Sequence, residues 1–168
     1  MNLQSRGEEG FTALHFASFH GNIRIIKLLV KHGANVFVQN KQDINLLHVA
    51  AQGDQPISIF YFKELGLSIN SFDVRKSTTL HWAAFAGAEL ALAYLVSWGA
   101  NVNAYDSKGL TPLHLAVKAS EDIRSTKSIR LLLFKGADRN AIDLNGKKPI
   151  DTVKEFREYK RNPNSTFV

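Results

Sequence analysis

Four histidines recur at a constant spacing, and histidine is the side chain best suited to hold a metal ion or move a proton near neutral pH. Each lies in a Leu-His-x-Ala sequence, and successive copies are 33 residues apart. The four are His15, His48, His81 and His114. A zinc ion needs its nitrogen ligands about 2.1 Å from one centre, whereas repeated helical units stack ~10 Å apart. We therefore expect a structural role for these histidines and no metal site.

The sequence contains no recognisable catalytic motif. It lacks the Gly-x-Ser-x-Gly nucleophile sequence, the Gly-x-x-x-x-Gly-Lys-Ser/Thr phosphate loop and the His-Glu-x-x-His zinc sequence. The absence of cysteine excludes a disulfide framework and a cysteine nucleophile, and it agrees with a reducing compartment. We expect no catalysis, cofactor or small-molecule substrate in these 168 residues, although a longer parent protein could still be an enzyme.

The residues around each histidine predict a repeated pair of helices. In the fourth copy, Thr111 can cap a helix that begins at Pro112, where a missing N–H has no cost. In the first copy, residues 22–32 place apolar side chains at helical spacing, and Gly33 can end that helix in the left-handed region. Each unit is thus predicted to be a short helix, a longer helix and a turn.

The turns between units are predicted to be tight hairpins. Asp106 and Asp143 each begin a turn that has glycine at its fourth position. In the two earlier turns Asp43 and Lys76 replace that glycine. We therefore expect those two tips to differ in shape.

The fourth unit is longer than the others. Its histidine precedes the following Gly136 by 22 residues, whereas the distance is 18 in the three earlier copies. An insertion into a stacked array must go outward, so we expect a surface loop near residues 120–127. This loop is either neutral or a binding loop, with Glu121, Arg124 and Lys127 as its candidate contacts.

A 33-residue period that carries Thr-Pro-Leu-His-x-Ala resembles the ankyrin repeat. This resemblance implies an all-α solenoid of helix-loop-helix units with projecting β-turn hairpins, forming one domain over residues 1–168. The expected repeats span about 7–39, 40–72, 73–105 and 106–142, followed by a capping half-repeat at 143–161 and a tail at 162–168. In the half-repeat, Asp151 stands in the histidine's place. The first repeat has no clearly polar outer helix, so we expect the array or its parent chain to continue before Met1.

The ankyrin resemblance implies protein recognition on a concave surface made by the hairpins and the inner helices. Aromatic side chains framed by arginine, the composition of interface hot spots, gather in the third repeat. The positions expected to face a protein or peptide partner are Phe72, Arg75, Lys76, Trp82, Phe85, Tyr105, Lys108 and Leu110. The alternative for Trp82 and Phe85 is that they pack against the neighbouring inner helix.

A narrower resemblance comes from residues 47–58, 80–84 and 135–140. These stretches are similar to the cytosolic ankyrin region of membrane-bound Asp-His-His-Cys protein S-acyltransferases (palmitoyltransferases). In that family the array recruits substrates, and Trp82 matches a tryptophan that helps to bind them. The Asp-His-His-Cys motif itself is not in this sequence. The alternative is a stand-alone adaptor or scaffold.

The net charge of +6 is unevenly placed, with +1 in residues 1–117 and +5 in residues 118–168. The basic end is either a solvated cap or a surface facing something anionic, such as a membrane adjacent to the parent chain. Acidic residues interrupt each basic run and the only interleaved aromatics are Phe156 and Tyr159, so we expect no nucleic acid partner. No secretory signal is visible, and we expect a cytoplasmic location, on the cytosolic face of an internal membrane if the parent is an acyltransferase.

Overall fold

The computed structural model describes residue 7 and residues 9–152, and helices dominate this part of the chain. No strand longer than an isolated bridge forms among these residues, so the predicted all-α class is confirmed. A further helical segment begins at residue 149. The helices with two described ends are α1 (Ala13–Phe19), α2 (Ile23–Lys31), α3 (Leu46–Gln52), α4 (Pro56–Glu64), α5 (Thr79–Ala86), α6 (Glu89–Ser97), α7 (Pro112–Ile123) and α8 (Lys127–Phe134).

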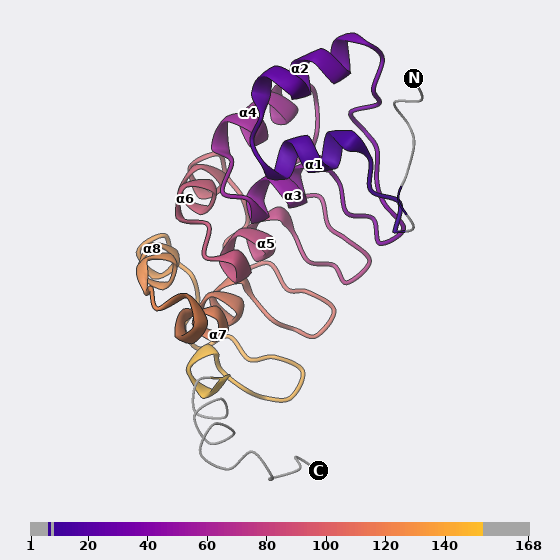
Figure 1. The fold of residues 1–168 in the computed structure, drawn as a ribbon. Helices are drawn as coiled ribbons and strands as arrows, with labels where there is room; N and C mark the ends of the chain where they lie inside the picture. Colours follow the sequence, from indigo (N-terminus) through magenta and orange to yellow (C-terminus); the bar gives the residue numbers. More distant parts are fainter. Residues whose placement is uncertain (1–6, 8, 153–168) are drawn as a thin grey trace.

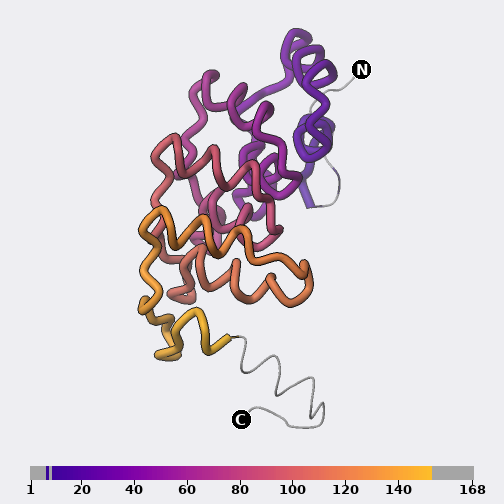
Figure 2. The backbone as a smooth tube through the Cα atoms, turned by 90° about the vertical axis from the view of Figure 1, so that its left-hand side faces the viewer, coloured from indigo at the N-terminus to yellow at the C-terminus, as the bar shows by residue number. Residues whose placement is uncertain are grey.

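The helices stack in two rows, as Figure 1 shows. The inner row is α1, α3, α5 and α7, and the outer row is α2, α4, α6 and α8. The loops between units project from the edge of the stack opposite the outer row. The backbone tube in Figure 2, seen from the outer side, shows the units following one another along a single axis. None of the helices in the described residues is long and apolar enough to cross a membrane.

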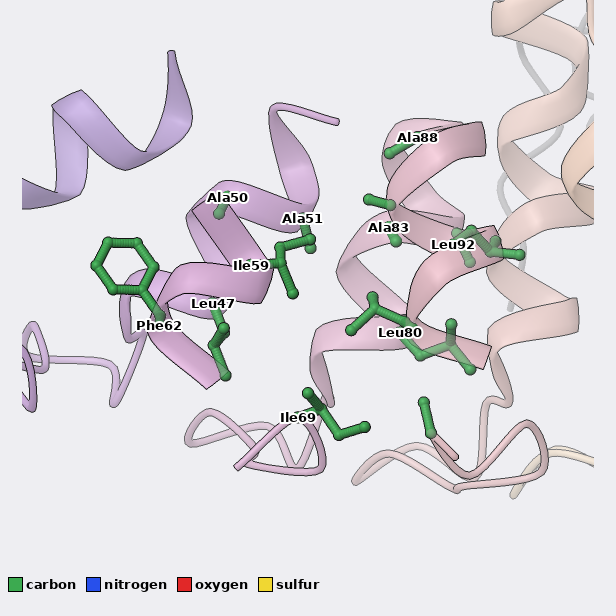
Figure 3. Close-up of a cluster of buried hydrophobic side chains, with 14 of the residues drawn as sticks. Leu47, Ala50, Ala51, Ile59, Phe62, Ile69, Leu80, Ala83, Ala88 and Leu92 are labelled. Atoms are coloured by element: carbon green, nitrogen blue, oxygen red, sulfur yellow. The ribbon is translucent and has the colours of Figure 1, made fainter. Parts of the chain in front are cut away.

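The core lies between the two rows and repeats with the period of the sequence. Leu47 and Leu80 enter it from inner helices, and Ile59 and Leu92 enter it from outer helices, all of them fully buried or nearly so. Figure 3 shows these side chains in one cluster. Each such side chain contributes roughly 1.5–3 kcal/mol by leaving water. The apolar positions recur every 33 residues because every unit buries the same helix faces against its neighbours.

All four repeated histidines cap the inner helices, and three of them also bond to the next unit. In every copy the ring Nδ1 accepts the backbone N–H of the residue before the helix, at 3.1–3.2 Å. The opposite nitrogen is therefore the protonated one in the neutral ring. The Nε2 atoms of His15, His81 and His114 lie 3.0–3.2 Å from a carbonyl oxygen of the following unit. The rings thus cap helices and link neighbours, which no single unit could do alone.

His48 departs from this pattern. Its ring is fully buried, and its Nε2 makes no hydrogen bond of standard geometry in the described part of the chain. Burial lowers the pKa of His48 from 6.5 to about 4, although Asp73 and nearby backbone groups pull the pKa upward. A charged ring at this position is therefore strongly disfavoured in the folded chain.

The four turn tips share one backbone conformation, so the expected difference at Asp43 and Lys76 was wrong. Both residues take φ 57°, close to the 73° of Gly109 and the 72° of Gly146. The side-chain oxygen of the first turn residue accepts two backbone N–H groups in every tip. These paired bonds hold the left-handed residue in place whether or not it is glycine.

The four extra residues of the fourth unit lengthen a helix and do not form the expected loop. Helix α7 has 12 residues, whereas the other inner helices have seven or eight. It ends at Arg124, which takes the left-handed conformation. Lys127 begins α8 and forms an ion pair with Glu89 of α6 at 3.1 Å, and Ser125 also donates to that carboxylate. The added turn therefore contacts the preceding unit, and Glu121 lies within the helix.

The start of the capping half-repeat reproduces the histidine's hydrogen bond with a carboxylate. The backbone N–H of Lys148 donates to Oδ2 of Asp151 at 3.1 Å, the bond that a ring nitrogen accepts in the full repeats. The rest of the expected half-repeat (153–161), the tail (162–168) and the basic segment containing Phe156 and Tyr159 lie outside the described residues.

Candidate partner-binding surface

A pocket of about 460 Å³ lies between two successive hairpins, and we call it the hairpin pocket. Its lining residues are Asn70, Phe72, Lys76, Thr78, Asn101, Ala104 and Tyr105. Phe72 is 60% exposed and Tyr105 is 53% exposed, so neither ring belongs to the core. Three of the predicted contact residues, Phe72, Lys76 and Tyr105, therefore line one pocket, although Tyr105 lies 33 residues after Phe72 in the sequence.

A backbone bridge and a side-chain hydrogen bond fix the geometry of the hairpin pocket. Phe72 and Thr78 form an antiparallel bridge across one hairpin. The next unit is tied to it because the N–H of Asn101 donates to Oδ1 of Asn70 at 3.2 Å. The two aromatic side chains are thus presented by connected backbone segments, which reduces the ordering cost of binding.

The cations near the pocket differ in how they are paired. Arg75 lies 3.5 Å from the buried carboxylate of Asp73. Lys76 and Lys108 are exposed, and neither makes an ion pair with another described residue. Arg75 is therefore partly satisfied within the chain, Lys76 adds positive charge to the pocket lining, and Lys108 adds positive charge to the turn that follows Tyr105.

Trp82 is held by its own chain and does not line the hairpin pocket. Its indole N–H donates to Oδ2 of Asp73 at 3.2 Å, and its ring lies 5.8 Å from the ring of His48 in α3. The side chain remains partly exposed. Contacts with the neighbouring inner helix and with Asp73 therefore account for part of the indole, and the rest of the side chain is exposed.

The remaining predicted contacts are distributed more widely. Phe85, on α5, is 54% exposed and lies outside the pocket lining. Leu110 is partly buried, and its carbonyl oxygen accepts from the His81 ring. Arg124 and Lys127 belong to the join between α7 and α8 and are not pocket residues.

The sequence reasoning missed the polar part of the hairpin pocket. Asn70 and Asn101 resemble ordinary turn residues in the sequence, and Thr78 is recognisable there only as a helix cap. Their position beside the aromatic rings depends on how adjacent units stack. The pocket thus combines two aromatic rings with amide, hydroxyl and ammonium groups, which suit an extended peptide with its own backbone donors and acceptors. Among the described residues, no group of three or more His, Cys, Asp or Glu side chains is placed to hold a metal ion.

Comparison with known families agrees with this architecture. A model for ankyrin repeats in three copies matches residues 47–143, more than half of the chain. A single ankyrin repeat also matches residues 9–41. The chain belongs to the ankyrin-repeat family, as the sequence pattern predicted, and ankyrin repeats of this kind form a protein–protein interaction module.

Curated relatives share short parts of the chain. The Notch-regulated ankyrin repeat-containing protein A of Danio rerio is 42% identical over 60 residues, which cover 36% of this chain and 54% of the relative. The Notch-regulated ankyrin repeat-containing protein of Homo sapiens is also 42% identical over 60 residues, covering 36% and 53%. Ankyrin repeat and SOCS box protein 3 of Bos taurus is 58% identical over 43 residues, 26% of this chain and 8% of that protein. The chain spans about half the length of the first two relatives.

Proposed function

We propose that this chain binds an extended segment of a partner protein in the hairpin pocket. The observation that carries the proposal is that two exposed aromatic rings, Phe72 and Tyr105, line one pocket whose two hairpins are joined by a hydrogen bond from the Asn101 N–H to Oδ1 of Asn70. Monomeric folds rarely leave such rings in water beside one another without a binding role.

The chemistry of the pocket defines the partner segment. An apolar or aromatic side chain of the partner fits between the two rings, and carbonyl groups of its backbone can accept from the side-chain NH2 groups of Asn70 and Asn101. Lys76 and Lys108 favour an acidic residue close to that anchor. The expected ligand is therefore a short stretch with one apolar anchor and a neighbouring carboxylate.

The energy of binding would come mainly from the rings. A buried aromatic side chain removes 150–250 Å² from water, and about half of each ring is still available here, so each ring contributes about 2 kcal/mol before ordering costs. Two anchors of this size suit a reversible interaction.

The test is to select peptides from a random display library on the chain and to measure their affinity by fluorescence anisotropy. Phe72→Ala combined with Tyr105→Ala should weaken binding of a selected peptide by at least about tenfold, the size of a hot-spot loss. Phe134→Ala, which removes an exposed ring from α8, is the matched control and should change the affinity less than about twofold. Peptides that bind the double variant and the unchanged chain equally would contradict the proposal.

A more specific version is that the chain recruits substrates for a membrane-bound Asp-His-His-Cys S-acyltransferase. What supports it is the Leu80-His81-Trp82-Ala83 sequence and the partly exposed indole of Trp82, held beside Asp73 next to Phe72. The relatives reported above lend it no support, and the alternative is an adaptor that needs no enzyme.

In either case we propose a cytoplasmic site of action. Reading the gene beyond the codon for Val168 separates them: an Asp-His-His-Cys motif with membrane spans favours recruitment, and a stop codon or another domain type favours the adaptor.

A further inference from the structure

The outer row of helices exposes an apolar surface that the hairpin pocket does not explain. We define the outer patch as Ile57 and Phe60 of α4, Leu90 and Tyr94 of α6, and Trp98 at the end of α6. The first four side chains are 69%, 49%, 57% and 48% exposed, in that order. The Trp98 ring lies 5.9 Å from the ring of Phe60 and 5.3 Å from that of Tyr94. The five side chains thus lie on two adjacent helices, and an exposed patch of this kind marks a binding surface.

The outer patch is open and has basic ends. The pocket within it, about 340 Å³, is lined by Pro56, Ile57, Phe60, Tyr94 and Trp98. On one side α2 carries exposed Arg24, Lys27 and Lys31, and on the other side α8 carries exposed Arg130 beside Lys127, which is paired with Glu89.

Negative charge on the outer row is already neutralised. The four outer helices contain six Lys/Arg and two Glu, a net charge of +4 (6 − 2). Glu64 pairs with Lys63 at 3.0 Å, and Glu89 pairs with Lys127 at 3.1 Å. The surface therefore offers apolar groups and cations, and its two carboxylates face lysines of the same chain.

The shape of the stack favours contact with a flat surface. Figure 1 shows the outer row along the convex edge, with α4 and α6 between α2 and α8. A plane that touches this edge meets α4 and α6, which carry the outer patch, before it meets α2 and α8. Long Lys and Arg side chains can reach back, and charges still attract over the Debye length of about 8 Å at physiological salt.

We propose that the outer patch docks on a membrane surface that contains anionic lipids. Tyr94 and Trp98, whose rings carry a polar group, would lie at the boundary between headgroups and acyl chains, and the apolar ring of Phe60 would enter its acyl side. The cations of α2 and α8 would lie against lipid phosphates and carboxylates. A protein partner usually presents both positive and negative charges, whereas this basic surface is complementary to negative charge only. The inference concerns the edge opposite the hairpins and does not depend on the proposed peptide site.

The first experiment is co-sedimentation of the 168-residue chain with lipid vesicles. Vesicles of phosphatidylcholine with about 30% phosphatidylserine should bind the chain at least about tenfold more tightly than phosphatidylcholine alone, and the binding should fall as salt rises. Phe60→Ser with Tyr94→Ser should lower the partition coefficient by about tenfold. Phe72→Ser with Tyr105→Ser, which removes two rings of similar exposure from the hairpins, should change it less than about twofold.

A second pair of variants tests the basic ends. Lys27→Glu with Arg130→Glu should abolish the preference for anionic vesicles, because it reverses the charge on both sides of the outer patch. Lys41→Glu with Lys148→Glu makes the same change in net charge on the hairpin side and should keep most of that preference. Equal loss in both variants would show a non-specific charge effect and would overturn the proposal.

The two tryptophans provide a direct reporter, since the chain contains only Trp82 and Trp98. In a Trp82→Phe variant, Trp98 fluorescence should shift to shorter wavelength and become shielded from acrylamide when anionic vesicles are added. In Trp98→Phe, the remaining Trp82 should not respond.

Absence of binding to anionic vesicles, or an unchanged Trp98 signal, would overturn the proposal. So would a dimer in light scattering that the Phe60→Ser/Tyr94→Ser variant converts to a monomer, since the patch would then join two copies of the chain.

Discussion

At the scale of single residues, His48 shows that the same residue at equivalent repeat positions can differ in how readily its ring is protonated. All four histidines accept the same capping hydrogen bond, but only His48 lacks a standard hydrogen bond at Nε2 among the described residues. Burial lowers the pKa of His48 to about 4 and also lowers the pKa of His81. Both rings are therefore harder to protonate in the folded chain than in the unfolded chain.

The chain should consequently lose stability as the pH falls below 6.5. Between pH 6.5 and pH 4 the unfolded state binds a proton at His48 that the folded state does not, so the free energy of unfolding decreases with decreasing pH. His48 alone should account for about 2 kcal/mol between pH 7.5 and pH 5, and for about 3 kcal/mol below pH 4. Urea unfolding at a series of pH values measures this change.

Two substitutions identify the residue responsible. His48→Gln keeps an oxygen that can accept the Asn45 N–H but cannot be protonated, so it should flatten the dependence of stability on pH. His20→Gln, at an exposed position, should keep the wild-type slope. A His48→Gln variant as sensitive to pH as the wild-type chain would place the titration elsewhere.

At the scale of elements, the lengthened helix α7 contacts the unit before it. Gly87 ends α5 in the left-handed conformation with φ 66°, and a Cβ atom added there would lie 2.5 Å from Cδ1 of Ile123. The added turn of α7 therefore occupies the space that a side chain at position 87 would need. Inserted residues can thus extend a helix and pack against the neighbouring unit.

Gly87→Ala should lower the free energy of unfolding by about 1–3 kcal/mol, because it combines left-handed strain with the contact to Ile123. Gly33→Ala is the matched control, since Gly33 has φ 88° and no neighbouring atom within 4 Å of the added Cβ. Gly33→Ala should lower the free energy of unfolding only by the cost of the left-handed backbone conformation. Adding Ile123→Ala to Gly87→Ala should recover part of the loss in denaturant unfolding, and purely additive effects would exclude the contact.

At the scale of the whole molecule, stability comes from interfaces between units. Leu80 is almost completely buried in the cluster that also contains Leu47 of the preceding inner helix. Linear arrays gain most of their stability from contacts between neighbouring units. The stability of the units at both ends therefore depends on the units in the middle.

Leu80→Ala should therefore destabilise the entire chain, by about 2–5 kcal/mol. Circular dichroism, which reports all helices, and tryptophan fluorescence, which reports the third unit, should still show coincident transitions in denaturant. Phe85→Ala, at a largely exposed position on the same helix, should cost much less. Separate transitions for the two signals in Leu80→Ala would show that the units unfold independently.

The repeat architecture was accessible from the sequence because each unit uses the same local signals. Thr111 and Pro112 begin a helix, Gly33 ends one, and the 33-residue period places the apolar faces in register. These are properties of short stretches, and they required no knowledge of distant contacts. The same regularity led to the ankyrin family, which the family comparison confirms.

Features that depend on contacts between units required the tertiary structure. The added turn of α7 packs through Ile123 on Gly87 of the preceding unit, a contact that the sequence did not indicate. Phe72 and Tyr105 line one pocket because two hairpins stack, while Trp82 is drawn to Asp73 and His48. By itself, the sequence determined that the chain is an array of helix pairs and how often they recur, because those signals are local, but it did not predict the added turn of α7. The tertiary structure decided which side chains share a pocket, which lack a hydrogen-bond partner and which face water. The reason is that free energies of burial and hydrogen bonding depend on neighbours that are distant along the chain.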